Sequence, residues 1–205
     1  NKYYLNYLKN CSASEAKHYV LKDEGEDNII DIFESTNLNL DCLESKFVQH
    51  LKNYPVKAWG DEDDVPFDEI IIRNQETVSN GITFDRIVIT SLFSQSCGER
   101  CGFSNEAILI YKGQYWYIRG SNEHGVESKF INKDIMLVKN LMTTHRRNYL
   151  FDVNTKLFTS LPDGELDFKE DHIIVRGQKS YFATRGAFWF DSKRNYSGEM
   201  IELIS

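Results

Sequence analysis

Residues 107–118 read AILIYKGQYWYI, and this stretch decides the fold. Two runs of aliphatic and aromatic residues flank the dipeptide Lys112-Gly113, and such side chains favour the pleated backbone of a strand. A glycine between two strands can adopt the positive φ that a tight turn requires. The stretch therefore predicts a β-hairpin.

Similar runs occur on both sides of this hairpin at short, regular spacing. Asn154-Thr155-Lys156 separates two of them and predicts a second hairpin. The predicted strands outside the first hairpin cover residues 67–72, 84–93, 126–131, 135–141, 149–153, 157–159, 173–175, 180–184, 187–190 and 200–204. This pattern predicts an antiparallel sandwich, a barrel or a partial-propeller-like meander.

Residues 149–190 resemble one blade of a β-propeller. They contain a strand ending in Phe151-Asp152-Val153, a polar turn, a second strand, and Asp163-Gly164 before a further strand pair. A blade takes roughly 40 residues, so residues 67–205 are too few to close a propeller comfortably. The resemblance implies antiparallel hairpins.

Residues 1–54 have the apolar spacing of helices instead. Leu40, Leu43, Phe47 and Leu51 share one helix face, and they predict a helix that starts within residues 41–44. Ser12-Ala-Ser-Glu15 is a capping-box pattern, which predicts an earlier helix over residues 15–24 that ends at Gly25. Residues 28–33 predict a short helix between these two.

The chain is therefore predicted to be an α+β protein. A helical segment, residues 1–57, packs on an antiparallel β domain, residues 65–205, and the two form one cooperative unit. The aromatic runs 115–117 and 188–190 fit this arrangement if the helices cover the second face of the sheet. Otherwise they form an exposed patch for a protein or a carbohydrate.

The cysteines form two pairs that are local in the sequence: Cys11 with Cys42, and Cys97 with Cys101. We read them as two disulfides, although four cysteines allow three pairings. A bond between Cys11 and Cys42 would stabilise the N-terminal segment by about 3–4 kcal/mol. Disulfides persist in oxidising compartments, so they predict an extracytoplasmic protein, periplasmic or secreted.

The pair Cys97 and Cys101 encloses Glu99 and Arg100 in a small loop. A disulfide there would chiefly fix the shape of that loop. The alternatives are a zinc site completed by His124 and His145, or a nucleophilic thiolate whose pKa Arg100 would lower. The C-x₃-C spacing favours the disulfide over both.

Two further features fit export. No stretch approaches the ~18 consecutive apolar residues of a membrane-spanning helix. The chain begins at Asn1 rather than methionine, as after removal of a signal peptide or trimming of the chain.

The net charge of −7 is concentrated in one place. Asp61-Glu62-Asp63-Asp64, with Asp68 and Glu69, carries almost all of the acidic excess. A nearly neutral remainder lacks the basic stripe that nucleic-acid binding requires, so we predict no nucleic-acid partner. The acidic run is either a solvated loop, a docking surface for a basic partner, or a cation site.

The sequence contains no motif for a known reaction. The five histidines do not cluster, and H-E-x-x-H, G-x-S-x-G and a glycine-rich phosphate loop are all missing from the sequence. Glu99 and Glu123 could serve as an acid–base pair, as in an exported hydrolase or carbohydrate-active enzyme. We predict no metal and no cofactor.

We therefore expect an exported, non-enzymatic factor that binds another protein. An inhibitor, an immunity-type protein and an envelope accessory protein all fit this description, while a structural or adhesive module is a further class. The expected contact residues are Asp61, Glu62, Asp63, Asp64, Glu99 and Arg100.

Overall fold

The computed structural model describes residues 2–22, 29–53, 68–78, 82–93, 102–121, 124–141, 148–161, 165–168, 173–177, 180–184 and 200–202. Within them the chain forms two helices and a series of strands. In chain order these are α1 (Lys2–Asn10), β1 (Lys17–Lys22), β2 (Ile29–Ser35), α2 (Leu40–Asn53), β3 (Asp68–Thr77), β4 (Thr83–Phe93), β5 (Gly102–Tyr111), β6 (Gln114–Gly120), β7 (Val126–Phe130), β8 (Ile135–Asn140), β9 (Asn148–Asp152), β10 (Phe158–Ser160), β11 (Glu165–Phe168), β12 (Ile173–Gly177), β13 (Ser180–Thr184) and β14 (Met200–Glu202).

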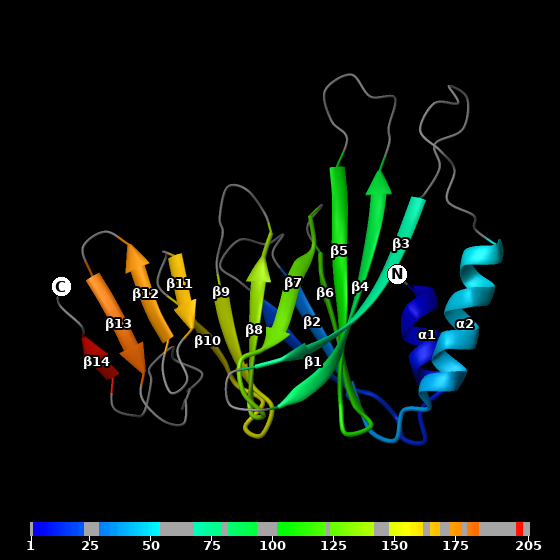
Figure 1. Ribbon diagram of the computed structural model, residues 1–205, viewed down its shortest axis with the longest axis horizontal. Coiled ribbons are helices and arrows are strands. Elements are labelled where there is room, and N and C mark those ends of the chain that lie inside the picture. Colours follow the sequence, from blue (N-terminus) through cyan, green and yellow to red (C-terminus); the bar gives the residue numbers. More distant parts are fainter. Residues whose placement is uncertain are drawn as a thin grey trace. The chain divides into compact units, whose positions relative to one another are not determined.

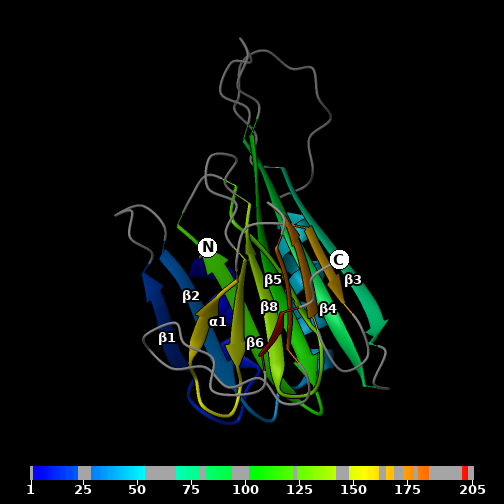
Figure 2. The ribbon, with the colours of Figure 1, turned by 90° about the vertical axis from the view of Figure 1, so that its left-hand side faces the viewer.

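The chain divides into two compact units. The first comprises Asn1–Gln75 and Phe84–Val126, and the second comprises Glu76–Thr83 and Glu127–Ser205. The first unit contains both helices and nearly all of a six-stranded sheet in the order β1-β2-β6-β5-β4-β3 (Figures 1 and 2). The α+β class predicted from the sequence is confirmed.

The predicted hairpin is the centre of this sheet. β5 and β6 pair from Ala107↔Ile118 to Tyr111↔Gln114, and the turn residues Lys112 and Gly113 both have positive φ, 49° and 75°. Two positive φ values give the turn a twist that matches that of the strands it joins. The side chains of residues 107–110 and 115–118 are all buried, so both faces of the hairpin lie inside the protein.

Helices α1 and α2 cover one face of the sheet. Tyr4 and Leu8, one turn apart on α1, are fully buried, and Leu43 and Phe47 are their counterparts on α2. These four pack with a layer of sheet side chains: Phe33, Ile87, Ile89, Ile108, Ile110, Tyr115 and Tyr117. The helical layer predicted to cover the aromatic strand is therefore present on this face.

A disulfide joins the two helices. Cys11, directly after α1, is bonded to Cys42 in the first turn of α2, and their Cα atoms lie 5.6 Å apart. The predicted pairing of Cys11 with Cys42 is confirmed. Cys97 and Cys101 lie outside the described residues.

The two helices predicted over residues 15–24 and 28–33 are wrong. Where the structure describes these segments, they form β1 and β2, which pair antiparallel from Lys17↔Glu34 to Lys22↔Ile29. The serines of the capping-box pattern bond elsewhere: the hydroxyl of Ser12 donates to the carbonyl of Leu8 at 2.6 Å, and that of Ser14 lies 2.8 Å from Ser35 Oγ. Pairing in the sheet overrides the local helix signal.

The third predicted helix is correct, and only its start differs. α2 begins at Leu40, because the side-chain oxygen of Asn39 accepts a hydrogen bond from the amide of Cys42 at 3.0 Å. Asn39 is thus the residue that caps the helix.

The second unit contains two antiparallel sheets of four strands each, in the orders β10-β9-β8-β7 and β11-β12-β13-β14. The predicted second hairpin is β9–β10, in which the carboxylate of Asp152 accepts from the amides of Asn154 and Thr155 at 2.8 and 3.1 Å. The segment 149–190, which resembles a propeller blade, includes β9 and β10 of the first four-stranded sheet and β11, β12 and β13 of the second. β11 is an additional strand, and the strand predicted over residues 187–190 lies outside the described residues.

The predicted boundary between residues 57 and 65 also lies outside the described residues, so the division into segments 1–57 and 65–205 stays a prediction. β1 and β2, however, belong to the same sheet as β3–β6. Residues before and after the boundary thus share one sheet.

Candidate functional site

The predicted contact residues Asp61, Glu62, Asp63, Asp64, Glu99 and Arg100 lie outside the described residues. The strands that flank them are described. β3 follows the acidic run and starts at Asp68, while the segment from Cys97 to Cys101 lies in the sequence between the end of β4 at Phe93 and the start of β5 at Gly102.

These three strand ends lie at the same end of the sheet (Figure 1). Phe93 is paired directly with Gly102. Where β3 ends and β4 begins, the amide of Val78 donates to the carbonyl of Ile82 at 3.0 Å, and the hydroxyls of Thr77 and Thr83 lie 3.0 Å apart.

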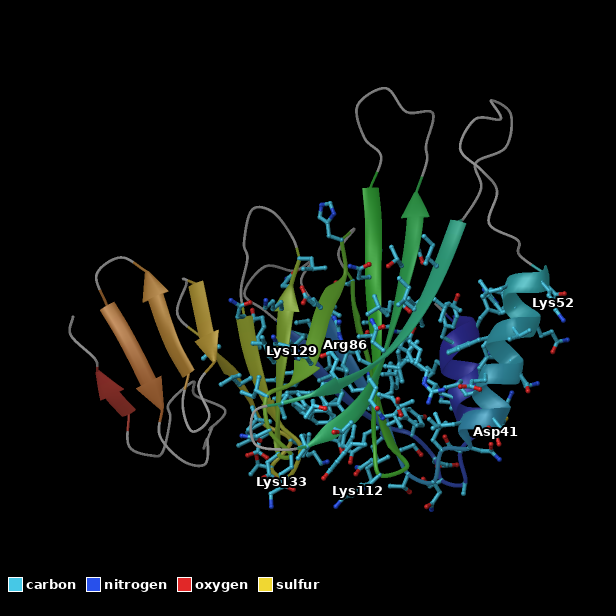
Figure 3. The ribbon with its side chains drawn as sticks, in the orientation of Figure 1. Asp41, Lys52, Arg86, Lys112, Lys129 and Lys133 are labelled. Atoms are coloured by element: carbon cyan, nitrogen blue, oxygen red, sulfur yellow. A yellow bond between two sulfur atoms is a disulfide. The ribbon has the colours of Figure 1, made fainter. Side chains whose placement is uncertain are left out.

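These contacts bring the end of β3 to the start of β4, and the two strands are neighbours in the sheet, so they run antiparallel. The start of β3 is therefore beside the end of β4. Both predicted contact segments are therefore attached at one end of the sheet. Lys112, in the β5–β6 turn, lies at the opposite end (Figure 3).

The structure also reveals a constellation that the sequence did not suggest. We call it the polar row; it runs across β1, β2, β6 and β5 on the face that carries the helices and comprises His18, Asp31, Phe33, Glu106, Tyr117 and Arg119.

Asp31 is the centre of the charged part of the row. Its Oδ1 lies 2.7 Å from Nε2 of His18, and its Oδ2 lies 3.4 Å from Nε of Arg119. The side chain of Asp31 is 19% exposed, that of Arg119 27% and that of His18 44%. His18 is thus the most accessible member of this trio.

The side chains of His18 and Arg119 both contact the ring of Phe33. The imidazole of His18 stacks on its ring with centroids 4.3 Å apart and planes 4° from parallel. The guanidinium of Arg119 lies 5.0 Å from the centroid of the same ring, a cation–π contact. The imidazole of His18 and the guanidinium of Arg119 are therefore each held by an aromatic ring as well as by a carboxylate.

Tyr117 continues the row inward. Its ring lies 6.1 Å from that of Phe33, and its hydroxyl donates a hydrogen bond to the carboxylate of Glu106. Burial, and then the neighbouring charge of Glu106, raises the pKa of Tyr117 well above its usual value near 10, although Arg119 opposes this. The phenol consequently stays protonated and acts as a hydrogen-bond donor at neutral pH.

The row can bind hydrogen-bonding or charged groups through its exposed end. Its signal in the sequence is strand alternation, with Asp31 and Phe33 on one face of β2 and Tyr117 and Arg119 on the same face of β6. The incorrect helix prediction for residues 15–24 placed His18 on a helix, and this concealed the row.

His50 serves the packing of the helices. It is 3% exposed, and its two ring nitrogens each lie 3.1 Å from a tyrosine hydroxyl, Nε2 from Tyr4 and Nδ1 from Tyr7. A phenol can donate or accept, so it can pair with either nitrogen of either tautomer. The cluster joins α1 to α2.

The aromatic run 115–117 is not an exposed patch. Tyr115 and Tyr117 are fully buried and Trp116 is 2% exposed. Burial raises the pKa of Tyr115, while the nearby hydroxyls of Ser12 and Ser35 act in the opposite direction. The second run, residues 188–190, lies outside the described residues, and carbohydrate contact stays a prediction.

A shallow groove of about 550 Å³ runs along α2. Its lining includes the acidic residues Asp41 and Glu44, the exposed side chain of Val48, and Lys52. Figure 3 shows Asp41 and Lys52 near opposite ends of the helix. Glu44 is already paired with Arg73 of β3, which ties the helix to that strand.

The remaining chemical alternatives gain no support from this geometry. His145 and Glu123, proposed as a zinc ligand and an acid–base partner, lie outside the described residues. Within the described part, no three His, Cys, Asp or Glu side chains gather as a metal site, and no helix is long and apolar enough to span a membrane.

The chain was also compared with known proteins. No family model, no curated protein and no solved structure matches it.

Proposed function

We propose that this protein is an exported factor that binds another protein and does not catalyse a reaction. An inhibitor, an immunity-type protein and an envelope accessory protein are the forms that fit. The partner would contact the acidic run Asp61–Asp64 and the loop that carries Glu99 and Arg100.

One observation carries the proposal. The strand ends that flank the two segments, Asp68 on one side and Phe93 and Gly102 on the other, lie at the same end of one sheet. Binding surfaces are commonly built from loops that a rigid scaffold positions together. Two segments far apart in the sequence can therefore act on one partner.

The composition of the segments suggests the chemistry of that partner. Four consecutive carboxylates attract a basic surface and increase the rate at which such a partner is captured. A disulfide between Cys97 and Cys101 would hold the second segment in one shape before binding, which reduces the entropy lost on association. The partner is thus expected to be basic.

The disulfide between Cys11 and Cys42 supports the proposal that the protein is exported. Cys11 and Cys42 are bonded, and such bonds persist in oxidising compartments. Mass mapping of unreduced peptides from natively isolated protein checks this part: two disulfides are expected, whereas four alkylatable thiols would contradict export.

Affinity capture from the native host tests the function. The bait is the wild-type chain, the double variant D63N/D64N, or the double variant D41N/E44Q on α2, which removes the same number of charges elsewhere. A protein retained by wild type and D41N/E44Q, but weakened by D63N/D64N, is expected. The purified partner is then titrated against each bait.

Two outcomes would overturn the proposal. One is a partner whose affinity is unchanged in D63N/D64N and in a variant with Glu99 and Arg100 replaced by alanine. The other is recovery of no partner together with turnover of a glycan or ester by the wild-type chain.

A further inference from the structure

Arg119 and Arg73 are both partly exposed, but their guanidinium groups are paired in different ways. Arg73 uses its two terminal nitrogens: Nη1 pairs with Glu44, and Nη2 lies 3.5 Å from a carboxylate oxygen of Asp85. Arg119 instead uses Nε, which lies 3.4 Å from Oδ2 of Asp31. Within the described part of the chain, neither terminal nitrogen of Arg119 has a hydrogen-bond partner. Its terminal N–H donors are therefore available to an acceptor that the described residues do not supply.

The guanidinium of Arg119 is nevertheless held in place. Its side chain is 27% exposed, and the guanidinium lies 5.0 Å from the ring centroid of Phe33. The contact of Nε with Asp31 holds the same group at a second point. A donor that is already held in place loses less conformational entropy when a ligand binds. Arg119 is therefore better prepared for a ligand than an arginine that extends freely into solvent.

The charges near Arg119 limit the charge of the ligand. Asp31 contacts Arg119 with one oxygen and His18 with the other. A second carboxylate of the polar row, that of Glu106, accepts a hydrogen bond from Tyr117. Both carboxylates repel an anion, and they repel a phosphate dianion more strongly than a singly charged group. A carboxylate carries one charge, and its two coplanar oxygens match two parallel N–H donors of a guanidinium.

Two other classes of ligand fit the site less well. A cation would compete for Asp31, each of whose oxygens already has a partner in His18 or Arg119. A sugar or another ring would need an open aromatic face, but Phe33 is only 6% exposed because His18 and Arg119 lie against it. The available groups are hydrogen-bond donors, so the ligand is expected to be an acceptor.

We propose that Arg119 binds a carboxylate group at the exposed end of the polar row, beside His18. The terminal nitrogens Nη1 and Nη2 donate to the two oxygens of the ligand, while Nε keeps its contact with Asp31. A free small carboxylate and the C-terminal carboxylate of a peptide share this chemistry. The inference is separate from the proposed function, because it concerns a different surface and a ligand of opposite charge.

An NMR titration of the full chain tests the proposal, with sodium acetate as the probe and sodium chloride at equal ionic strength as the control. Acetate should shift the Nε–H signal of Arg119 and the ring signals of His18 along a saturable curve. The Nε–H signal of Arg73 should stay in place, because both terminal nitrogens of that residue are already paired. Sodium phosphate should bind more weakly than acetate.

A peptide probe distinguishes the two sources of the carboxylate. A short glycine–alanine peptide with a free C-terminal carboxylate should shift the same signals of Arg119 and His18, and the same peptide with an amidated C-terminus should not. The lower of the dissociation constants for acetate and for the acidic peptide then shows which source the site prefers.

A matched pair of variants separates the guanidinium geometry from its charge. Lysine keeps the positive charge but cannot donate two parallel hydrogen bonds, so R119K should raise the dissociation constant for acetate by about tenfold. R73K should leave it unchanged. Amide NMR spectra check that both variants remain folded, and the position of the shifts in wild type tests the site without any substitution.

Three results would overturn the proposal. The first is a wild-type protein in which acetate and chloride shift the signals of Arg119 and His18 equally. The second is acetate binding that a folded R119K leaves unchanged. The third is tighter binding of phosphate than of acetate.

Discussion

One face of the six-stranded sheet is covered in two different ways. Over β5 and β4 the helices pack apolar side chains, such as Leu8 and Phe47, against buried isoleucines. Over β1 and β2 the surface consists of the partly exposed polar row, with His18 and Arg119 at its open end. Phe33 and Tyr117 belong to both regions.

The difference separates residues that hold the fold from residues that are available for contacts. A fully buried apolar side chain stabilises the protein by several times as much as an exposed ion pair. The free energy of unfolding should therefore respond strongly to changes in the helix-covered region and weakly to changes in the polar row. The predictions that follow test this contrast, from the largest effect to the smallest.

Phe47→Ala should reduce the free energy of unfolding by about 3–5 kcal/mol, because it leaves a cavity against the rings of Tyr4 and Tyr7. Urea unfolding followed by circular dichroism measures this. The adjacent Val48, 52% exposed on the same helix, is the control. Val48→Ala should change the value by less than about 0.5 kcal/mol, and equal losses would contradict the contrast.

Replacing Cys11 and Cys42 by alanine should cost about 3–4 kcal/mol, because the bond closes a loop across a sequence separation of 31 residues. The same urea titration gives the loss. A change below about 1 kcal/mol would mean that the α1–α2 pair holds together without its covalent link.

Stability should fall as the pH rises above 10, where tyrosine usually ionises. Between that pH and the raised pKa of Tyr117, the unfolded chain loses the phenolic proton and the folded chain keeps it. In this pH range, each tyrosine whose pKa is raised in the folded state lowers the free energy of unfolding by about 1.4 kcal/mol per pH unit.

Tyr117→Phe should make this alkaline fall shallower, as measured by unfolding at several pH values above neutrality. Tyr3→Phe, which removes a phenolic hydroxyl from a residue that is 49% exposed, is the matched control. Equal slopes in all three proteins would show that Tyr117 ionises as freely in the folded state as in the unfolded chain.

His18→Ala should have a small effect on stability, below about 1 kcal/mol, because the imidazole is 44% exposed and its pair with Asp31 is screened by solvent. Thermal unfolding at neutral pH measures it. A loss as large as that of Phe47→Ala would place the polar row among the residues that hold the fold.

The sequence predicts the local elements of this fold well. The β5–β6 hairpin, the β9–β10 turn and α2 follow from patterns within a few residues, such as Lys112-Gly113 between two apolar runs. β1 and β2 do not, because the capping-box pattern predicts a helix over residues 15–24 and the apolar spacing predicts a short helix over residues 28–33. Their strand form depends on the distant β6, with which β2 pairs from Ile30↔Gly120 to Ser35↔Tyr115.

Pairing between strands that are distant in the sequence also limits how well the candidate sites can be predicted. The polar row gathers residues from positions 18 to 119, and only the strand order brings them together. The place of β3 at the edge of the described sheet is also a property of strand order, since its run of isoleucines could equally have belonged to a central strand. The acidic run Asp61–Asp64 and the segment from Cys97 to Cys101, by contrast, are predicted from local charge and spacing alone, and they lie outside the described residues.

Hydrogen exchange of the free protein and of its complex with the captured partner tests the central claim most directly. The account predicts slower exchange in peptides covering residues 61–64 and 97–101, with no change in peptides that cover His18 or Arg119. Protection confined to the polar row, or no protection in either segment, would contradict it.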